Sequence, residues 1–224
     1  MTALLAATGI GKSFGGTRVL DGVTLSIAPG EPVGLFGPNG SGKTTLANVL
    51  TGLLLPDVGS IAFEGRDVTR LPLDARYRLG MARTFQIPHP YPSLTVHEAL
   101  RVALAAAGSR TADGGRDERV EEILSRSGLF DQRFVPCGSL SQGCLRRLEF
   151  ARALACRPKL LILDEAFSAL SAADEEDLLA LLCAANREGG AAFLLISHNR
   201  MLLSSTCRRI LYLEEGRIAR ERAV

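Results

Sequence analysis

The chain has 224 residues, of which 46% are hydrophobic and 22% are charged, and its formal net charge is +2. This length predicts one α/β domain and argues against two full domains, while the composition excludes a largely disordered chain. The small net charge argues against nucleic acid as a partner. The five cysteines show no C-x-x-C spacing, so they indicate neither a disulfide framework nor a zinc site.

Cysteine use and hydropathy together indicate a protein of the reducing cytoplasm. The first residues lack a basic segment, so no signal peptide is expected. The longest uninterrupted apolar run, 178–185, is far shorter than the roughly 20 residues that span a bilayer. A role at a membrane would therefore require a partner.

The first part of the chain predicts an antiparallel β layer, followed by a strand, a glycine-rich loop and a helix. The apolar runs of the β layer alternate with glycine and polar breaks and cover residues 4–10, 18–20 and 23–27, with a turn at 28–31. The apolar run 32–36 then leads into the glycine-rich loop, and a helix is expected from 46–50 onward.

The glycine-rich loop fits the phosphate-binding pattern G-x-x-x-x-G-K-[ST] at every fixed position. It consists of Gly37, Pro38, Asn39, Gly40, Ser41, Gly42, Lys43, Thr44 and Thr45. Its glycines let backbone N–H groups converge on an anion, and the N-terminus of the next helix adds a positive dipole. A triphosphate is the natural ligand: Lys43 would reach its β- and γ-phosphates, and the Thr44 hydroxyl would bind Mg²⁺. The alternative, a chance glycine turn, fits poorly with the strand and helix that flank the loop.

The middle and last parts of the chain differ in the secondary structure that their apolar patterns predict. A short strand is expected at 59–65, and the segment 79–85 leads to Gln86. Between 87 and 156 the pattern predicts helices at 94–107, 117–127 and 142–156. The last part returns to alternating strands and helices, with strands at 159–164, 191–196 and 210–213 and a helix at 172–186.

These elements predict an α/β fold, a P-loop NTPase with a mostly parallel core sheet, an N-terminal antiparallel β layer and an inserted helical subdomain. Residues 1–224 would form a single domain. Within it, 1–86 and 157–224 would make the nucleotide-binding core, and 87–156 would make the helical subdomain. Catalytic groups are expected at the carboxyl ends of the core strands.

Two adjacent carboxylates, Asp164 and Glu165, end the predicted strand 159–164. An acid at the end of a buried strand needs a cation, and Mg²⁺ on a bound triphosphate would supply one to Asp164. Neighbouring side chains in a strand diverge, which would leave Glu165 free to polarise a water. The alternative is a solvated strand end. His198 follows the strand 191–196 and is expected to reach the same phosphate, although such a histidine is often structural.

With these motifs in place, the chain resembles the ATP-binding-cassette (ABC) ATPase family along nearly its whole length. Leu140-Ser141-Gln142-Gly143-Cys144 and the segment 145–154 are similar to the L-S-G-G-Q signature and its helix. The resemblance implies two cassettes packed head to tail, with each nucleotide held between the loop of one and the signature of the other. Ser141, Gln142 and Gly143 would then contact the nucleotide across the interface, at a helix N-terminus that favours an anion.

The resemblance also implies roles for three further residues. Gln86 would be the residue that touches Mg²⁺ and water, and His198 would be the switch histidine. Phe14, in Lys12-Ser13-Phe14-Gly15-Gly16, would stack on adenine, with a core phenylalanine as the alternative. The implied cofactors are ATP and Mg²⁺, with Thr44, Gln86 and Asp164 toward the metal and Glu165, His198 and Lys43 as the catalytic set.

Shorter motifs resemble one branch of the family more closely. The segments 80–86, 92–100 and 145–149 are similar to the ATP-binding subunits of importers for branched-chain amino acids, urea or amides. This branch implies a second ABC subunit, an integral membrane permease, an extracytoplasmic substrate-binding protein and a place at the cytoplasmic face of the cell membrane.

Three departures from the family pattern leave alternatives open. Gln142 and Cys144 replace the usual glycine and glutamine of the signature. Ala166 stands where proline is common, and Ala169-Leu170-Ser171 replaces Gly-Leu-Asp or Gly-Leu-Asn. The leading hypothesis is a transport motor that hydrolyses ATP. The alternatives are a nucleotide-dependent dimerisation switch with weakened catalysis in a heterodimer, and a soluble ABC ATPase without a transport role.

Overall fold

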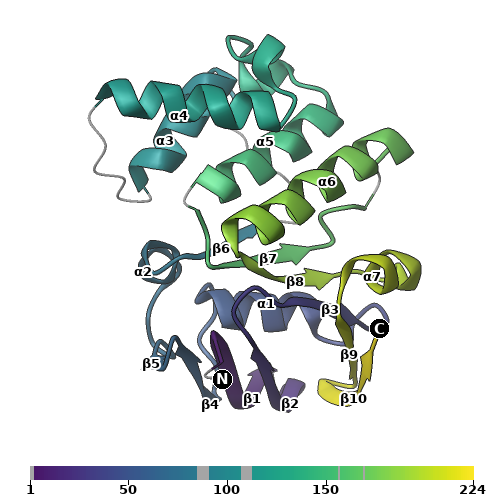
Figure 1. Cartoon of the computed structure of the whole chain (residues 1–224). Coiled ribbons are helices and arrows are strands. Elements are labelled where there is room, and N and C mark those ends of the chain that lie inside the picture. Colours follow the sequence, from purple (N-terminus) through teal and green to yellow (C-terminus); the bar gives the residue numbers. More distant parts are fainter. Residues whose placement is uncertain (1–2, 85–90, 107–112, 156, 169) are drawn as a thin grey trace.

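The computed structural model describes residues 3–84, 91–106, 113–155, 157–168 and 170–224 (Figure 1). Two β-sheets and a set of helices make up this part of the chain. The smaller sheet is antiparallel, in the order β2 (Thr17–Ile27), β1 (Leu5–Phe14), β4 (Val58–Phe63) and β5 (Arg66–Asp67). The expected N-terminal β layer is therefore present.

The expected short strands of this layer merge into two long ones. β1 and β2 form a hairpin whose two-residue turn is Gly15 (φ 53°) and Gly16 (φ 84°). Both residues adopt the left-handed conformation that a tight hairpin turn requires. The polar break at Asp21-Gly22 lies inside β2 and does not end it, because the β1–β2 pairing there is irregular in register.

The larger sheet has six strands, and all of them but one run parallel. The order is β10 (Arg217–Ala223), β9 (Arg209–Glu214), β3 (Pro32–Phe36), β8 (Ala192–Ile196), β7 (Leu160–Asp164) and β6 (Met81–Thr84). β10 pairs antiparallel with β9 at one edge. The carboxyl ends of β3, β7 and β8 therefore lie at the same edge of the sheet, as α/β folds require for a shared site.

The helices agree with the predicted ones where the apolar periodicity is strong. The described helices are α1 (Lys43–Thr51), α2 (Leu73–Arg78), α3 (Val96–Ala106), α4 (Asp113–Arg126), α5 (Gln142–Ala155), α6 (Ala172–Gly189) and α7 (Arg200–Thr206), with 3₁₀ turns at Phe130–Gln132 and Cys137–Ser139. The short helices α2 and α7 were not predicted. Within the described ranges, no helix combines the length and hydropathy needed to cross a membrane.

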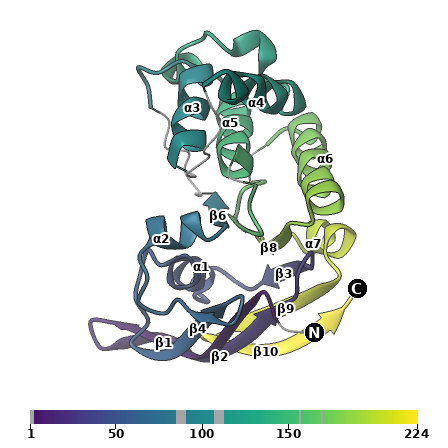
Figure 2. The same cartoon turned by 60° about the vertical axis from the view of Figure 1, so that its left-hand side comes forward.

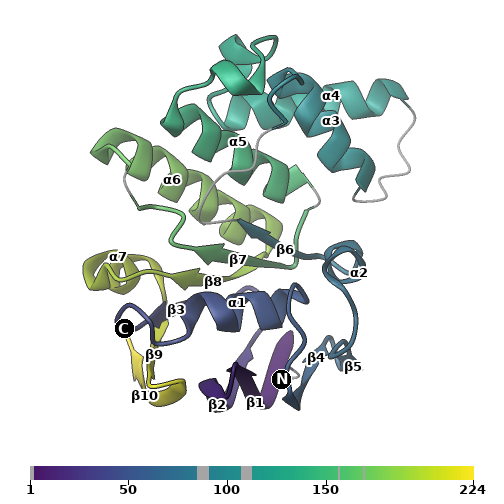
Figure 3. The same cartoon turned by 180° about the vertical axis from the view of Figure 1, so that it is seen from behind.

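Three buried apolar clusters hold these elements together. In Figure 3, α1 runs between the six-stranded sheet and the antiparallel layer, and its buried residues join side chains from both sheets in the first cluster. The second cluster packs α6 and α7 on the opposite face of the large sheet. The third belongs to α3, α4 and α5, which gather at the end of the molecule away from the antiparallel sheet (Figure 2).

A buried arginine fixes the C-terminal end of α1. Arg76 is fully buried and donates to the carbonyl oxygens of Val49 and Leu50, at 3.0 and 2.6 Å, and to those of Leu71 and Thr69. Helix C-termini leave carbonyl groups without intrahelical partners, and this guanidinium satisfies two of them. Burial lowers the pKa of Arg76 to about 10. These hydrogen bonds fix the C-terminal end of α1, the helix that begins within the phosphate-binding motif.

Candidate active site

The glycine-rich loop connects β3 to α1 and packs so closely against the backbone of β9 and β2 that side chains are excluded at two positions. A Cβ on Gly37 would lie 2.3 Å from the Leu213 carbonyl oxygen, and one on Gly42 would lie 2.9 Å from the Val19 carbonyl oxygen. Gly40 and Gly42 adopt φ values of 78° and 101°, in the left-handed region that glycine enters at low cost. The loop backbone therefore forms a cradle that only this glycine pattern allows.

Lys43 lies inside this cradle. Its ammonium donates to the carbonyl oxygens of Gly37 and Pro38, at 2.7 and 2.9 Å, so the side chain folds back over the loop. Ser41 Oγ is buried in the loop without a hydrogen-bond partner among the described residues. An ammonium and an unsatisfied hydroxyl in one glycine-rich loop are groups that an anionic ligand would engage.

Two adjoining hollows open in front of the loop. The first, of about 290 Å³, is lined by Val19, Asn39, Gly40, Gly42, Lys43, Thr44, Thr45 and Glu165. The second, of about 440 Å³, is lined by Asn39, Glu165, Ser168 and His198. The two share Asn39 and Glu165, so residues from the loop and from the ends of two strands meet in one place. Val19 and Ser168 were not predicted as site residues, because neither belongs to a motif that signals ligand binding.

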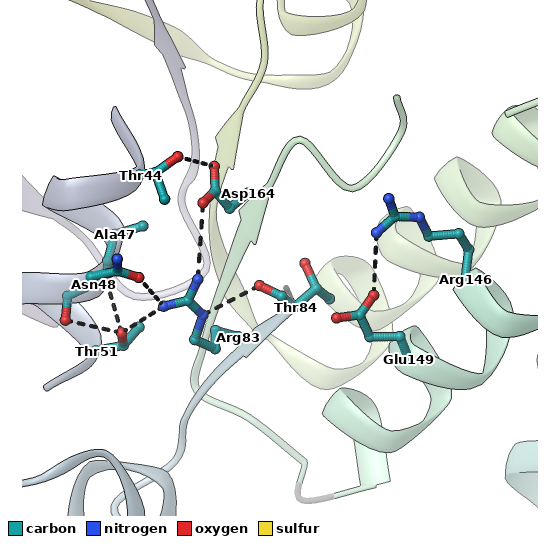
Figure 4. Close-up of polar contacts among 9 residues, drawn as sticks. All are labelled: Thr44, Ala47, Asn48, Thr51, Arg83, Thr84, Arg146, Glu149 and Asp164. Carbon is teal, nitrogen blue, oxygen red and sulfur yellow. Dashed lines mark hydrogen bonds and ion pairs between the residues drawn. The ribbon is translucent and has the colours of Figure 1, made fainter. Parts of the chain in front are cut away.

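Asp164 ends β7 and lies beside the first turn of α1 (Figure 4). Its Oδ1 accepts a hydrogen bond from Thr44 Oγ1 at 3.4 Å, and Arg83 Nη2 lies 3.9 Å from its Oδ2. Burial raises the pKa of this carboxyl group, while the Thr44 hydrogen bond and the Arg83 charge act in the opposite direction. Oδ2 has no hydrogen-bond partner among the described residues. A buried carboxylate oxygen in need of a partner, next to a threonine hydroxyl, fits a hard cation such as Mg²⁺.

Glu165 and His198 form a pair at the mouth of the hollows. His198 Nδ1 lies 3.0 Å from Glu165 Oε2, and the Glu165 side chain is 12% exposed. The expected divergence of Asp164 and Glu165 is present, but it does not come from strand alternation. Glu165 lies beyond the end of β7 with a left-handed φ of 50°, stabilised by hydrogen bonds with Ile196 and Ser168. Such a conformation costs on the order of 1–3 kcal/mol in a non-glycine residue and is often found at functional sites.

Phe14 is a surface residue, so the alternative of a core phenylalanine is wrong. It ends β1 and is 47% exposed, with the Lys12 ammonium 5.6 Å from the centre of its ring. An exposed aromatic ring beside a cation is available for stacking on a planar ligand. Gln86 lies outside the described residues, and its predicted role stays a prediction.

The signature segment lies apart from the hollows. α5 begins at Gln142, and Ser141 Oγ accepts a hydrogen bond from the Cys144 N–H at 3.2 Å, so Ser141 caps this helix. A Cβ on Gly143 would lie 2.9 Å from Asp174 Oδ2, which places the start of α5 against α6. None of Ser141, Gln142 and Gly143 lines either hollow.

Ser171, one of the departures from the family pattern, has a clear structural role. Its Oγ accepts from the Asp174 N–H at 3.2 Å and caps α6. The same hydroxyl donates to Asp174 Oδ2 at 2.7 Å, and Arg147 of α5 binds Asp174 and Asp177. The segment after Glu165 is therefore linked by polar contacts to the helix that follows the signature.

Comparison with known proteins identifies the family of this chain. The family model described as ABC transporter matches residues 20–168. The methionine import ATP-binding protein MetN of Brucella abortus is 38% identical over 214 residues, which cover 94% of this chain and 57% of that protein. An uncharacterized ABC transporter ATP-binding protein of Rhizobium meliloti is 39% identical over 177 residues, 79% of this chain and 65% of that one. The chain thus spans a little over half the length of the methionine import proteins that it matches.

Solved structures show the same fold over the whole chain. The ATP-binding cassette MJ1267 of an ABC transporter has a TM-score of 0.88 at 29% identity, covering 100% of this chain and 92% of the other. The ATP-binding cassette MJ0796, in a dimeric post-hydrolysis state bound to ADP and Pi, has a TM-score of 0.88 at 27% identity, covering 98% of both chains. With a family model that matches well over half of its residues, the chain belongs to the ABC transporter family as an ATP-binding cassette.

Proposed function

We propose that this chain binds and hydrolyses ATP as the energy-supplying subunit of an ABC import system. The observation that carries the proposal is the pair of adjoining hollows, lined by Lys43 and Thr44 on one side and His198 on the other, with Glu165 lining both and Asp164 beside Thr44. Loop, strand end and histidine come from separate parts of the sequence. A site assembled from three distant segments, each with the residue type that phosphoryl transfer uses, argues against coincidence.

Binding follows from the groups around the first hollow. The loop N–H groups and the N-terminus of α1 would hold the phosphates of ATP. Lys43 would exchange its contacts with the Gly37 and Pro38 carbonyls for contacts with phosphate oxygens, which form stronger charge-assisted hydrogen bonds. Thr44 and Asp164 are the described residues that would hold Mg²⁺, which when bound neutralises charge on the phosphates. Phe14 would stack on adenine.

Glu165 and His198, which line the second hollow, would carry out hydrolysis. Glu165 would accept a proton from an attacking water, since its carboxylate is at the mouth of the hollow and fixed by the turn after β7. His198 would hold that carboxylate in place through the 3.0 Å contact. Lys43 and the loop N–H groups would stabilise the charge that develops on the transferred phosphoryl group.

The place of the signature supports a second subunit. Ser141, Gln142 and Gly143 lie apart from this chain's own hollows, at the exposed N-terminal end of α5. We infer that they contact the nucleotide of a second ABC subunit. The dimeric state of the cassette MJ0796 bound to ADP and Pi supports this arrangement. The separate apolar core of α3, α4 and α5 supports the proposal that 87–156 is a helical subdomain, with 1–86 and 157–224 as the nucleotide-binding core.

The transport role rests on relatives. Several similar proteins are named for methionine import, which supports an importer that works with an integral membrane permease at the cytoplasmic face of the membrane and with an extracytoplasmic substrate-binding protein. For the substrate we propose a small polar molecule. The motifs at 80–86 and 145–149 favour a branched-chain amino acid, urea or an amide, and the names of the relatives favour methionine.

A second candidate function is a nucleotide-dependent dimerisation switch with weakened catalysis. Gln142 and Cys144 in the signature favour it, because they change the surface that a second cassette would present to ATP. The Glu165–His198 pair opposes it, because both groups are positioned for turnover.

Steady-state ATP hydrolysis, measured against protein concentration, tests the two candidates. For the hydrolysing subunit, the rate per molecule should rise with concentration as dimers form and should fall by roughly 10²–10⁴-fold in Glu165→Gln. A native chain that binds ATP but turns over no faster than Glu165→Gln would overturn the proposal and favour the switch.

A further inference from the structure

Arg83 lies at the centre of a buried polar cluster, between the α1 side chains Asn48 and Thr51 and the carboxylate of Asp164 (Figure 4). It belongs to β6, the edge strand next to β7, and its side chain is only 5% exposed. Nη1 donates to Asn48 Oδ1 at 2.6 Å and to Thr51 Oγ1 at 3.3 Å, and Nη2 lies 3.9 Å from Asp164 Oδ2. One guanidinium thus joins α1, β6 and β7.

The contacts of Arg83 connect α1, which carries Thr44, with Asp164. Thr44 and Asp164 are the two proposed metal-binding residues. Asn48 and Thr51 lie on α1, one turn and two turns after Thr44, and Asp164 accepts from Thr44 at 3.4 Å. Thr44 and Asp164 are therefore held by two routes: directly through their own hydrogen bond, and through Arg83 by way of α1. The direct hydrogen bond is long, and the 3.9 Å ion pair with Arg83 adds a second, electrostatic constraint on where the carboxylate lies relative to the helix.

Two nearby carboxylates, Asp164 and Glu149, favour the positive charge of Arg83. Burial lowers the pKa of Arg83, while the negative charges of Asp164 and of Glu149 on α5 act against that effect. A buried arginine keeps its charge in proteins and presents a planar fork of donors, so it can bind an amide oxygen and face a carboxylate at once. Lys43, the other nearby cation, donates to carbonyl groups of the loop.

We propose that Arg83 is a positioning residue for Mg²⁺: it holds Asp164 and α1 in a fixed relation, so that Asp164 and Thr44 face one metal position. This inference rests on the proposed function, since it assigns a part of the same site. Partners that orient metal ligands typically contribute a factor of about 10 to 100 in metal affinity. Arg83 itself touches neither nucleotide hollow.

The test is a Mg²⁺ titration of nucleotide binding that involves no turnover. A fluorescent, non-hydrolysable ATP analogue is bound to the native chain and to Arg83→Met, first in EDTA and then with increasing Mg²⁺. Arg83→Met is expected to raise the Mg²⁺ concentration at the midpoint at least ~10-fold and to leave binding in EDTA unchanged. Arg83→Lys is not expected to restore the midpoint, because its single ammonium lacks the planar fork by which Nη1 binds Asn48 while Nη2 faces Asp164.

The matched control is Arg78→Met, which removes an exposed arginine paired with Asp74 at the end of α2 and should leave the midpoint unchanged. An unchanged midpoint in Arg83→Met, with the native chain responding to Mg²⁺, overturns the inference alone. A native chain that binds no nucleotide overturns the proposed function and this inference with it. If Arg83→Met fails to fold by thermal melting, Asn48→Ala decides: it removes one anchor of the guanidinium and should raise the midpoint, and no rise overturns the inference.

Discussion

The loop side and the signature side of this cassette are built in opposite ways. On the loop side, Lys43, Asp164 and Glu165 are largely buried and held by contacts with the loop, with α1, with β6 and with the histidine that follows β8. On the signature side, Ser141 and Gln142 are exposed at the start of α5, and the neighbouring polar contacts of Arg147 with Asp174 and Asp177 lie near the surface. The difference fits the proposal that the loop side binds nucleotide with groups of its own chain, whereas the signature is a surface that would contact a second subunit.

The largest expected effect separates chemistry from binding on the loop side. Glu165→Gln keeps the size of the side chain but removes the carboxylate that would accept a proton, so hydrolysis should fall by roughly 10²–10⁴-fold. ATP affinity should stay near the native value, because the loop contacts are intact. Hydrolysis and equilibrium binding are both measured, with Glu176→Gln, an exposed acid on α6, as the control. Loss of binding together with turnover would contradict the assignment of Glu165.

The next largest expected effect tests phosphate binding by the glycine-rich loop. Lys43→Ala removes the ammonium that would bind the phosphates, and a charge-assisted hydrogen bond contributes about 1.5–3 kcal/mol, so ATP affinity should fall by roughly 10- to 100-fold. Titration of a fluorescent ATP analogue measures the affinity. Lys159→Ala, which removes an exposed lysine paired with Glu64, serves as the control and should bind like the native chain. Native affinity in Lys43→Ala would place the phosphates elsewhere.

A smaller effect tests whether the signature acts across subunits. Ser141→Ala should leave ATP binding by dilute, monomeric protein unchanged and should reduce turnover at high protein concentration, where dimers form. The lost contact with a phosphate predicts a reduction of roughly 10-fold or more. The exposed Ser125→Ala, also in the helical region, is the matched control. If dilute protein loses ATP affinity in Ser141→Ala, the signature contacts the nucleotide of its own chain.

The smallest effect concerns the link between the two sides. Ser171→Ala removes the cap of α6, and loss of such a cap costs about 1 kcal/mol, which for a chain of this size lowers the melting temperature by about 2–4 °C. Ser171→Thr should keep most of the native stability, since threonine retains a hydroxyl that can cap α6 and donate to Asp174. Thermal unfolding followed by circular dichroism measures both. Equal melting of Ser171→Ala and the native chain would show that the cap contributes nothing.

Prediction from sequence succeeded for elements with strong local signals and failed for weak ones. The loop and the strands β7 and β8 were predicted because their residues are contiguous and uniformly apolar or glycine-rich. β10 was missed because its sequence is rich in arginine and it lies exposed at the sheet edge, so it lacks apolar alternation. α2 and α7 were missed because helices of six and seven residues are too short to show a period.

The sequence by itself indicated which residues form the candidate site, because a phosphate-binding loop, a strand that ends in two acids and a signature are local patterns. Only the tertiary structure decided how these groups work together. Glu165 itself adopts a left-handed backbone conformation and its side chain contacts His198. Arg83 contacts both Asp164 and α1. Those relations join residues far apart in the chain, and they depend on strand order and backbone geometry that no local pattern encodes.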